Sequence, residues 1–128
     1  MDCQECSAET VRFAVPDEYE SSLPGEEDVV ALCTRCLAIQ PATEAPDEPD
    51  FERVSDGFPS GEAAIPLALL LGLLENLALY RSEITELLDA VERAGTDPLL
   101  ALDRLARDTD IETDLDLSGR RRQLEQLL

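Results

Sequence analysis

Two motifs, Cys3-Gln4-Glu5-Cys6 and Cys33-Thr34-Arg35-Cys36, with 26 residues between them, decide how the N-terminal part of this chain folds. The two pairs contain all four cysteines of the 128-residue chain. Each Cys-x2-Cys turn can point both of its sulfur atoms at one ion, and two turns together form a tetrahedral shell that suits Zn2+. The surrounding segment has too few apolar residues for a core of its own, so a metal is expected to stabilise it. The sequence therefore predicts one structural zinc ion per chain, with the ligands Cys3, Cys6, Cys33 and Cys36.

Three other interpretations use the same cysteines. Disulfides require an oxidising compartment, and a thioredoxin-like dithiol requires a βαβ unit that the sequence does not supply. Iron in a rubredoxin-like site is compatible with four thiolates. It is less favoured because Ser7 and Leu37 follow the pairs where such knuckles usually have glycine, and the aromatic core of a rubredoxin is missing. A closed shell of four cysteines leaves no position for water or substrate, so a structural role is expected.

The chain is strongly acidic. It has 29 Asp and Glu against 10 Lys and Arg, a formal net charge of −19, and no histidine. The lack of histidine excludes Ser-His-Asp catalysis, Cys-His catalysis and histidine-ligated metals. The charge argues against binding to DNA or to an anionic membrane. At molar salt the Debye length falls to about 3 Å, which removes most self-repulsion. The acidity and the absence of lysine therefore predict adaptation to a salt-rich cytoplasm, with an acidic mesophilic interaction protein as the alternative.

Targeting signals are not evident. The N-terminus begins Met1-Asp2-Cys3, which is acidic and lacks a basic region followed by an apolar run. The longest apolar stretch, 65–74, is too short to span a bilayer. We therefore expect a cytoplasmic protein with reduced thiols and no membrane contact.

The composition divides the chain into three segments: a zinc ribbon over 1–40, an acidic proline-rich linker over 41–61 and a helical domain over 62–128. In the first, apolar residues alternate with others over 11–15, and a second apolar run covers 29–32, which predicts two strands. A helical turn is expected over 17–22, before the loop Leu23-Pro24-Gly25. The linker is expected to be extended and stiffened by charge, although Phe51, Val54 and Phe58 would let it dock on a neighbouring part.

The third segment has helical periodicity. Leucines and other apolar residues recur at about 3.5-residue spacing up to Gly95, which is compatible with one helix over 62–94 or with two helices divided near Arg81-Ser82, with Ser82 as a cap. Asp97-Pro98 predicts the start of a further helix, and Ser118 is a candidate cap for the last one. The predicted fold class is α+β: a small N-terminal zinc β-ribbon followed by an all-α bundle or hairpin of three to four helices.

The stretch 65–74 is apolar on nearly every face. Only about 65 residues of the helical segment are available to cover it, which makes complete burial within one subunit difficult. The sequence therefore predicts that the apolar helix, over 65–80, joins a homodimer or contacts a protein partner. The candidate association face consists of Leu67, Leu70, Leu71 and Leu74.

Arg120-Arg121-Arg122 is the only basic cluster. It is a candidate contact for an anion or an acidic partner. The alternative, which we favour, is pairing within the chain, either with Asp110, Asp114 or Asp116 or in a salt network along a helix.

The two cysteine pairs, the acidic linker, the stretch 97–106 (DPLLALDRLA) and the ending 123–128 (QLEQLL) together resemble a family of small acidic zinc-ribbon proteins from halophilic archaea. The resemblance covers most of the chain and implies zinc binding and a salt-rich habitat. It implies no activity, because the family has none assigned.

These observations favour a non-enzymatic adaptor or regulatory protein, in which the zinc-stabilised ribbon is a rigid recognition surface. The alternative is a nucleic-acid-binding ribbon in transcription or translation, which the charge disfavours because Arg12 and Arg35 are the only cations of the ribbon. A third interpretation is electron transfer by an iron centre.

Overall fold

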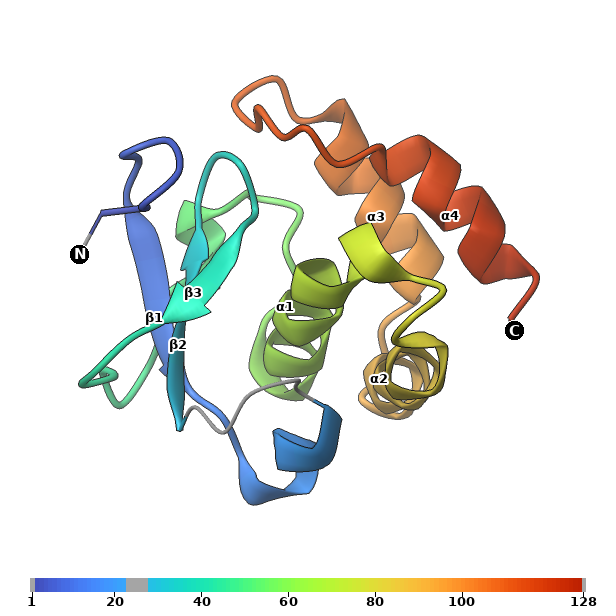
Figure 1. Cartoon of the computed structure of the whole chain (residues 1–128), viewed down its shortest axis with the longest axis horizontal. Coiled ribbons are helices and arrows are strands. Elements are labelled where there is room, and N and C mark those ends of the chain that lie inside the picture. Colours follow the sequence, from blue (N-terminus) through green and yellow to red (C-terminus); the bar gives the residue numbers. More distant parts are fainter. Residues whose placement is uncertain (1, 23–27, 128) are drawn as a thin grey trace.

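The structure, a computed structural model, describes residues 2–22 and 28–127 (Figure 1). A three-stranded antiparallel sheet near the N-terminus is followed by four α-helices in this part of the chain, which confirms the α+β class. The loop predicted at Leu23-Pro24-Gly25 lies outside the described residues. No helix in the described ranges has both the length and the apolar character that a bilayer crossing requires.

The sheet has the strand order β1-β2-β3. β1 (Thr10–Ala14) and β2 (Val29–Cys33) match the two predicted strands, and the predicted turn between them is the 3-10 helix η1 (Asp17–Ser22). β3 (Ile39–Pro41) has no predicted counterpart, because three residues are too few to display an alternating pattern. It pairs with β2 so that Ile39 lies opposite Leu32.

One face of the sheet packs on the helices. Val11, Phe13 and Val15 are buried, and so are Val30 and Leu32 on β2. These side chains share one hydrophobic core with residues from every α-helix. The three composition segments of the sequence are therefore parts of one packed unit.

The proline-rich segment returns to the core after β3. Phe51, in the 3-10 helix η2 (Phe51–Arg53), lies with its ring centroid 5.3 Å from that of Phe13 and 5.4 Å from that of Phe58. All three rings are buried, and Val54 is buried beside them. The expected docking of this segment is confirmed, and its residues 51–58 contribute to the core.

The long apolar pattern forms two helices. After the short 3-10 helix η3 (Gly61–Ala63), α1 (Ala64–Leu73) passes through the 3-10 turn η4 (Leu74–Asn76), and α2 (Arg81–Arg93) follows. The break lies just before the predicted position, and the N-cap is Tyr80; Ser82 sits inside the first turn.

Gly95 ends α2 as predicted. Its φ angle is +92°, a conformation that glycine adopts at little cost. The Gly95 N–H donates to the Glu92 carbonyl at 2.9 Å, and the Thr96 N–H donates to the Val91 carbonyl at 3.2 Å. This pair of bonds is a Schellman motif, which satisfies carbonyls that the helix end leaves unpaired.

The predicted association face is wrong. Figure 1 shows α1 between the sheet and α2, and the four leucines proposed for the face are at most 2% exposed: Leu67, Leu70, Leu71 and Leu74. The expectation counted only the helical segment as cover for α1. The sheet and the docked residues 51–58 supply the missing apolar surface, so α1 is the central helix of a single chain.

The last two helices lie side by side (Figure 1). α3 (Pro98–Arg107) begins as predicted, with Asp97 Oδ1 accepting hydrogen bonds from the backbone N–H groups of Leu99 at 3.0 Å and Leu100 at 3.3 Å. α4 (Leu117–Glu125) is capped by Asp116, which accepts from Gly119 N–H at 3.0 Å. Ser118 is therefore inside the helix and is not its cap.

Candidate metal centre

The two cysteine turns are built in the same way. Each has the pattern Cys-x2-Cys-x-Ala, and the two copies are thirty positions apart. The Cys3 N–H donates to the Ala8 carbonyl at 2.8 Å, and the Cys33 N–H donates to the Ala38 carbonyl at 2.9 Å. These equivalent bonds close each turn and direct its two sulfurs to the same side.

The residue after each second cysteine has a left-handed backbone. Ser7 and Leu37 both have φ angles of 64°. Glycine adopts this conformation freely, whereas an ordinary L-residue pays about 1 kcal/mol or more. The knuckle geometry therefore forms without glycine at positions 7 and 37, at a cost in backbone energy. Leu37 offsets part of this cost by burying its side chain in the core.

The four sulfurs form one cluster. All four cysteines are unbridged, and their Sγ atoms lie within 4.8 Å of one another. The Sγ atoms of Cys3 and Cys36 are 3.7 Å apart, and those of Cys6 and Cys33 are 3.4 Å apart. A disulfide needs about 2.0 Å, whereas tetrahedral bonds of about 2.3 Å to one ion place sulfurs about 3.8 Å apart. The spacing fits a metal ion, and the structure brings together all four predicted ligands.

Backbone groups also point at the sulfurs. The Glu5 N–H donates to Cys3 Sγ at 3.4 Å, and the N–H groups of Arg35 and Cys36 donate to Cys33 Sγ at the same distance. Such donors stabilise the thiolate form, which is the form that binds metal. Cys3 and Cys33 are buried, and Cys6 and Cys36 are partly exposed. One side of the centre therefore faces the core and the other faces the surface.

The thiols have unequal proton affinities. Hydrogen bonds from the Ala8 backbone and from Cys33 lower the pKa of Cys6 to about 7. Burial raises the pKa values of Cys33 and Cys36. A bound divalent cation reverses the effect of burial, because a coordinated thiol loses its proton. The buried sulfurs therefore favour a cation as the partner that offsets their desolvation.

Polar side chains connect the two turns. The Gln40 amide oxygen accepts from the Gln4 N–H at 3.0 Å, and its nitrogen donates to the Asp2 carbonyl at 3.5 Å. The N–H and hydroxyl of Thr34 both donate to the Glu9 carbonyl, at 3.0 and 2.9 Å. Sequence reasoning missed both residues. Their only signal is a polar side chain within or just after a cysteine pair, which is too common to be diagnostic.

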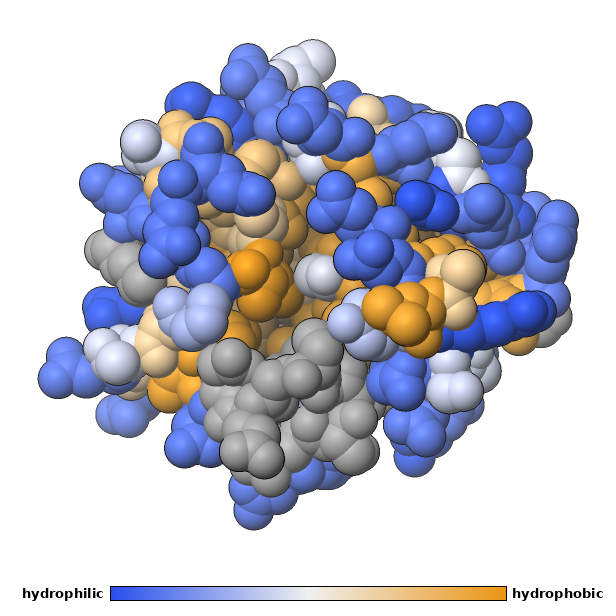
Figure 2. Space-filling model, in the orientation of Figure 1, coloured by the Kyte–Doolittle hydropathy of each residue, from blue (hydrophilic) through white to orange (hydrophobic). Residues whose placement is uncertain are grey.

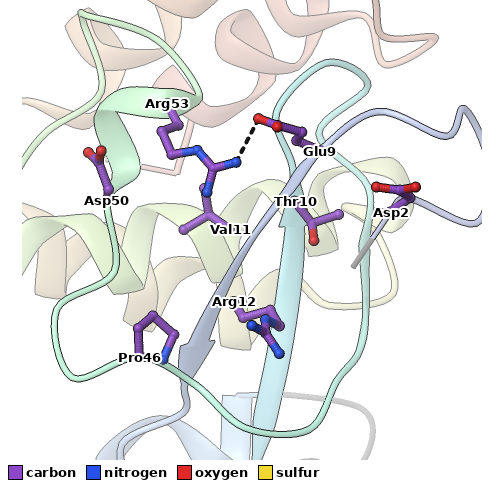
Figure 3. A pocket seen from close by; sticks show the side chains of 8 residues that line it. All are labelled: Asp2, Glu9, Thr10, Val11, Arg12, Pro46, Asp50 and Arg53. Atoms are coloured by element: carbon purple, nitrogen blue, oxygen red, sulfur yellow. Dashed lines mark hydrogen bonds and ion pairs between the residues drawn. The ribbon is translucent and has the colours of Figure 1, made fainter.

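An ion pair ties the first turn to the docked segment. Arg53 Nη2 lies 2.6 Å from Glu9 Oε2, across a cavity of about 220 Å³ (Figure 3). The Arg53 guanidinium lowers the pKa of the Glu9 carboxyl. Arg12, on the same cavity, donates to the Thr43 carbonyl at 3.2 Å. Arg12, one of the two cations of the ribbon, therefore binds a backbone carbonyl of its own chain, while the other, Arg35, is exposed.

The basic cluster is paired mainly within the chain. Arg121 forms ion pairs with Asp103, at 2.8 Å, and with Glu125. Arg120 donates to Gln123 at 2.9 Å and to the Glu75 carbonyl at 3.1 Å. Pairing within the chain was expected, and the contacts with Glu125 and Gln123 fit the expected network along a helix. The contacts with Asp103 on α3 and with the Glu75 carbonyl in η4 were not predicted, and Asp110, Asp114 and Asp116 are not among the partners described.

Comparison with known proteins adds one assignment. A family model described as "Family of unknown function (DUF6276)" matches residues 2–128. No curated protein and no solved structure matches the chain.

Proposed function

The chain belongs to the DUF6276 family, whose function is unknown, and from that premise we propose a non-enzymatic adaptor stabilised by one structural zinc ion. The observation that carries the proposal is the cluster of four unbridged thiols within 4.8 Å. Zn2+ is favoured over Ca2+ or Mg2+ because every ligand is a sulfur atom. Zinc would cross-link the two cysteine turns, with Cys3, Cys6, Cys33 and Cys36 as its ligands.

A structural role follows from the closed donor set. Four protein ligands complete a tetrahedron, so neither water nor substrate has a coordination position at the ion. The ion joins the N-terminal turn to the turn between β2 and β3. It fixes the two cysteine turns relative to each other, in addition to the packing of the sheet on the shared core. A rigid surface of this kind suits recognition of another protein, which is the adaptor role.

The proposed environment is a salt-rich cytoplasm. None of the described Asp and Glu residues is buried, since the only buried polar or charged residues described are Thr10, Gln40 and Ser55. A net charge of −19 on a small protein opposes folding at low ionic strength. Concentrated salt screens this repulsion, and a reducing cytoplasm keeps the four thiols available for the ion.

Metal identity is tested on the purified full-length chain. We expect a colourless protein with one zinc per chain, and a Co2+-substituted form with the intense sulfur-to-metal absorption of a tetrahedral four-thiolate site. Cys6→Ser should weaken that absorption and the affinity, because it removes one ligand at the exposed side. Ser7→Ala is the matched control, since it changes the neighbouring residue and leaves all four ligands. A red iron protein, or Co2+ spectra identical in Cys6→Ser, would overturn the proposal.

A further inference from the structure

A groove of about 510 Å³ lies beside the cysteine cluster. The partly exposed cysteines Cys6 and Cys36 form one end of the groove. β3 forms one wall, and the C-terminal end of α1 with residues 112–115 forms the other. Figure 2 shows the hollow on the face between β3 and α1, with apolar colouring inside it and polar residues around it. The sequence alone does not reveal it, because its three parts are far apart in the chain.

The floor of the groove is apolar. Leu71 and Leu37 are buried beneath it, and Ile39 and Leu115 are partly exposed in it. α1 approaches β3 closely at Gly72, where an added Cβ would lie 2.7 Å from Ile39 Cδ1. The lack of a side chain at Gly72 therefore allows α1 and β3, the two walls, to meet at the floor of the groove. A ligand in this groove can bury aliphatic side chains.

The rim of the groove carries one sign of charge. Its acidic residues come from three separate parts of the chain: Glu5, Glu75, Glu112 and Asp114. No arginine is among the residues that line it. All four acidic residues are exposed, and their carboxylates form none of the ion pairs described in the structure. The groove is therefore complementary to a basic ligand and repels nucleic acid.

β3 presents a strand edge to the groove. Within the part of the chain that the structure describes, β3 is the outermost strand and pairs only with β2. The bonds Cys33 N–H to Ala38 carbonyl and Ala42 N–H to Val29 carbonyl fix the register, so residues 38, 40 and 42 direct their peptide groups toward β2. Ile39 lies between residues 38 and 40, at a position where the peptide groups point in the opposite direction. Its N–H and carbonyl therefore face away from β2, as does the Pro41 carbonyl, and these groups can pair with one more strand.

We propose that this groove binds an extended segment of a partner protein in which basic side chains alternate with aliphatic ones. The segment pairs with the outer edge of β3 at Ile39, buries its aliphatic side chains against Leu71 and Leu115, and directs its basic side chains to the carboxylates of the rim. This is recognition by strand addition, in which the main chain supplies affinity and alternate side chains supply specificity. The inference rests on the proposed adaptor function and names the chemistry of its partner.

High salt does not remove the charge complementarity. At about 1 M salt the Debye length is about 3 Å, so only carboxylate and guanidinium groups in direct contact still attract. A segment held in the groove by backbone bonds places its side chains at that range. A second copy of this chain is a poor occupant, since its one basic run lies in α4 and is largely paired within its own helices.

The test uses the zinc-loaded full-length chain and a fluorescent synthetic peptide that alternates Arg and Val. Fluorescence anisotropy should detect saturable binding, and Glu112→Gln with Asp114→Asn should weaken it by at least tenfold. The matched control combines Glu86→Gln with Glu92→Gln, which removes the same charge from the exposed face of α2 and should leave the affinity within twofold. Equal loss in both double variants would overturn the site, because it would show that only net charge matters.

The strand pairing is tested without changing the protein. The same peptide with N-methyl groups at alternate positions should bind at least tenfold more weakly, and amide exchange at Ile39 should slow when the unmodified peptide binds. Three results would each overturn the proposal: unchanged affinity of the methylated peptide, amide exchange at Ile39 that does not slow when the peptide binds, and self-association of the chain through this groove. Zinc content is measured on the same samples. If the chain keeps its zinc and does not bind the peptide, only the proposed peptide site is refuted. If the chain binds no zinc, the proposed function is refuted.

Discussion

The Sγ atom of Cys6 lies 3.4 Å from the Sγ atom of Cys33, although 27 positions separate the two residues. Cys3 and Cys36 approach in the same crossed manner, at 3.7 Å. Each pair of cysteines therefore contacts the other pair, and an ion among them would close a loop that contains β1, η1 and β2. Because such a site rarely exists in the unfolded chain, the free energy of metal binding would add to the stability of the folded chain.

The left-handed residues of the two turns should respond oppositely to glycine. Ser7 is exposed and has a φ angle of 64°, so Ser7→Gly should raise the free energy of unfolding by up to about 1 kcal/mol. Leu37 has the same backbone angle, but its side chain is only 2% exposed. Leu37→Gly should therefore destabilise the protein, since the lost burial outweighs the relieved strain. Urea unfolding of both zinc-loaded variants measures this; stabilisation by Leu37→Gly would contradict the structure.

The central position of α1 has a direct test. Leu70 is completely buried, so Leu70→Ala should lower the free energy of unfolding by about 2–5 kcal/mol. Leu79, in the turn before α2, is 71% exposed, and Leu79→Ala should change it by less than about 0.5 kcal/mol. Chemical denaturation measures both. If Leu70→Ala proved neutral in stability and instead dissociated an oligomer, the association face predicted from the sequence would be restored.

The burial of α1 shows where sequence reasoning stops. The sequence predicts that 65–74 is a helix that needs cover on all sides, and that Phe51, Val54 and Phe58 can dock on a neighbouring part. It does not predict that the second provides cover for the first, because composition does not reveal which surfaces meet. The docked segment and the sheet complete the cover of α1. Long-range packing of this kind has no periodic signal in the chain.

Helix caps provide a third prediction. Asp97 and Asp116 accept hydrogen bonds from the first turns of α3 and α4, so replacing either with Ala should cost about 0.5–2 kcal/mol. Ser118 lies inside α4, and Ser118→Ala should cost nothing measurable or stabilise slightly, because alanine has the higher helix propensity. Thermal unfolding of the three variants distinguishes the caps. A larger loss for Ser118→Ala than for Asp116→Ala would contradict the observed helix start.

The cap of α4 was misplaced for a simple reason. Asp116 and Ser118 are both good capping residues two positions apart. Only the backbone conformation decides between them. Asp97, which is followed by Pro98, carries two agreeing signals, and its cap was predicted correctly. The cysteines likewise carry two agreeing signals, the spacing within each pair and the absence of other cysteines, whereas Gln40 and Thr34 carry only one signal, which is too common to be diagnostic.

Stability should depend strongly on salt. The net charge of −19 is distributed over the whole surface, so raising KCl from about 0.1 to 2 M should increase the free energy of unfolding in urea by screening repulsion. Salt also strengthens apolar burial in any protein. A variant with Asp47→Asn, Glu86→Gln and Glu92→Gln isolates the charge effect and should show a shallower dependence. An identical dependence in this variant, or stability that falls with salt, would contradict the role given to the charge.

The most direct test of the central claim is native mass spectrometry of the full-length chain, refolded with zinc, beside its Cys33→Ser variant. Cys33 is completely buried and its sulfur contacts Cys6 of the other pair, so it is the ligand that the site can least replace. We expect one zinc ion per wild-type chain and none, or a weakly held one, in Cys33→Ser, together with a lower melting temperature. A wild-type chain that folds fully without metal, or a variant that keeps zinc with unchanged affinity, would contradict this expectation.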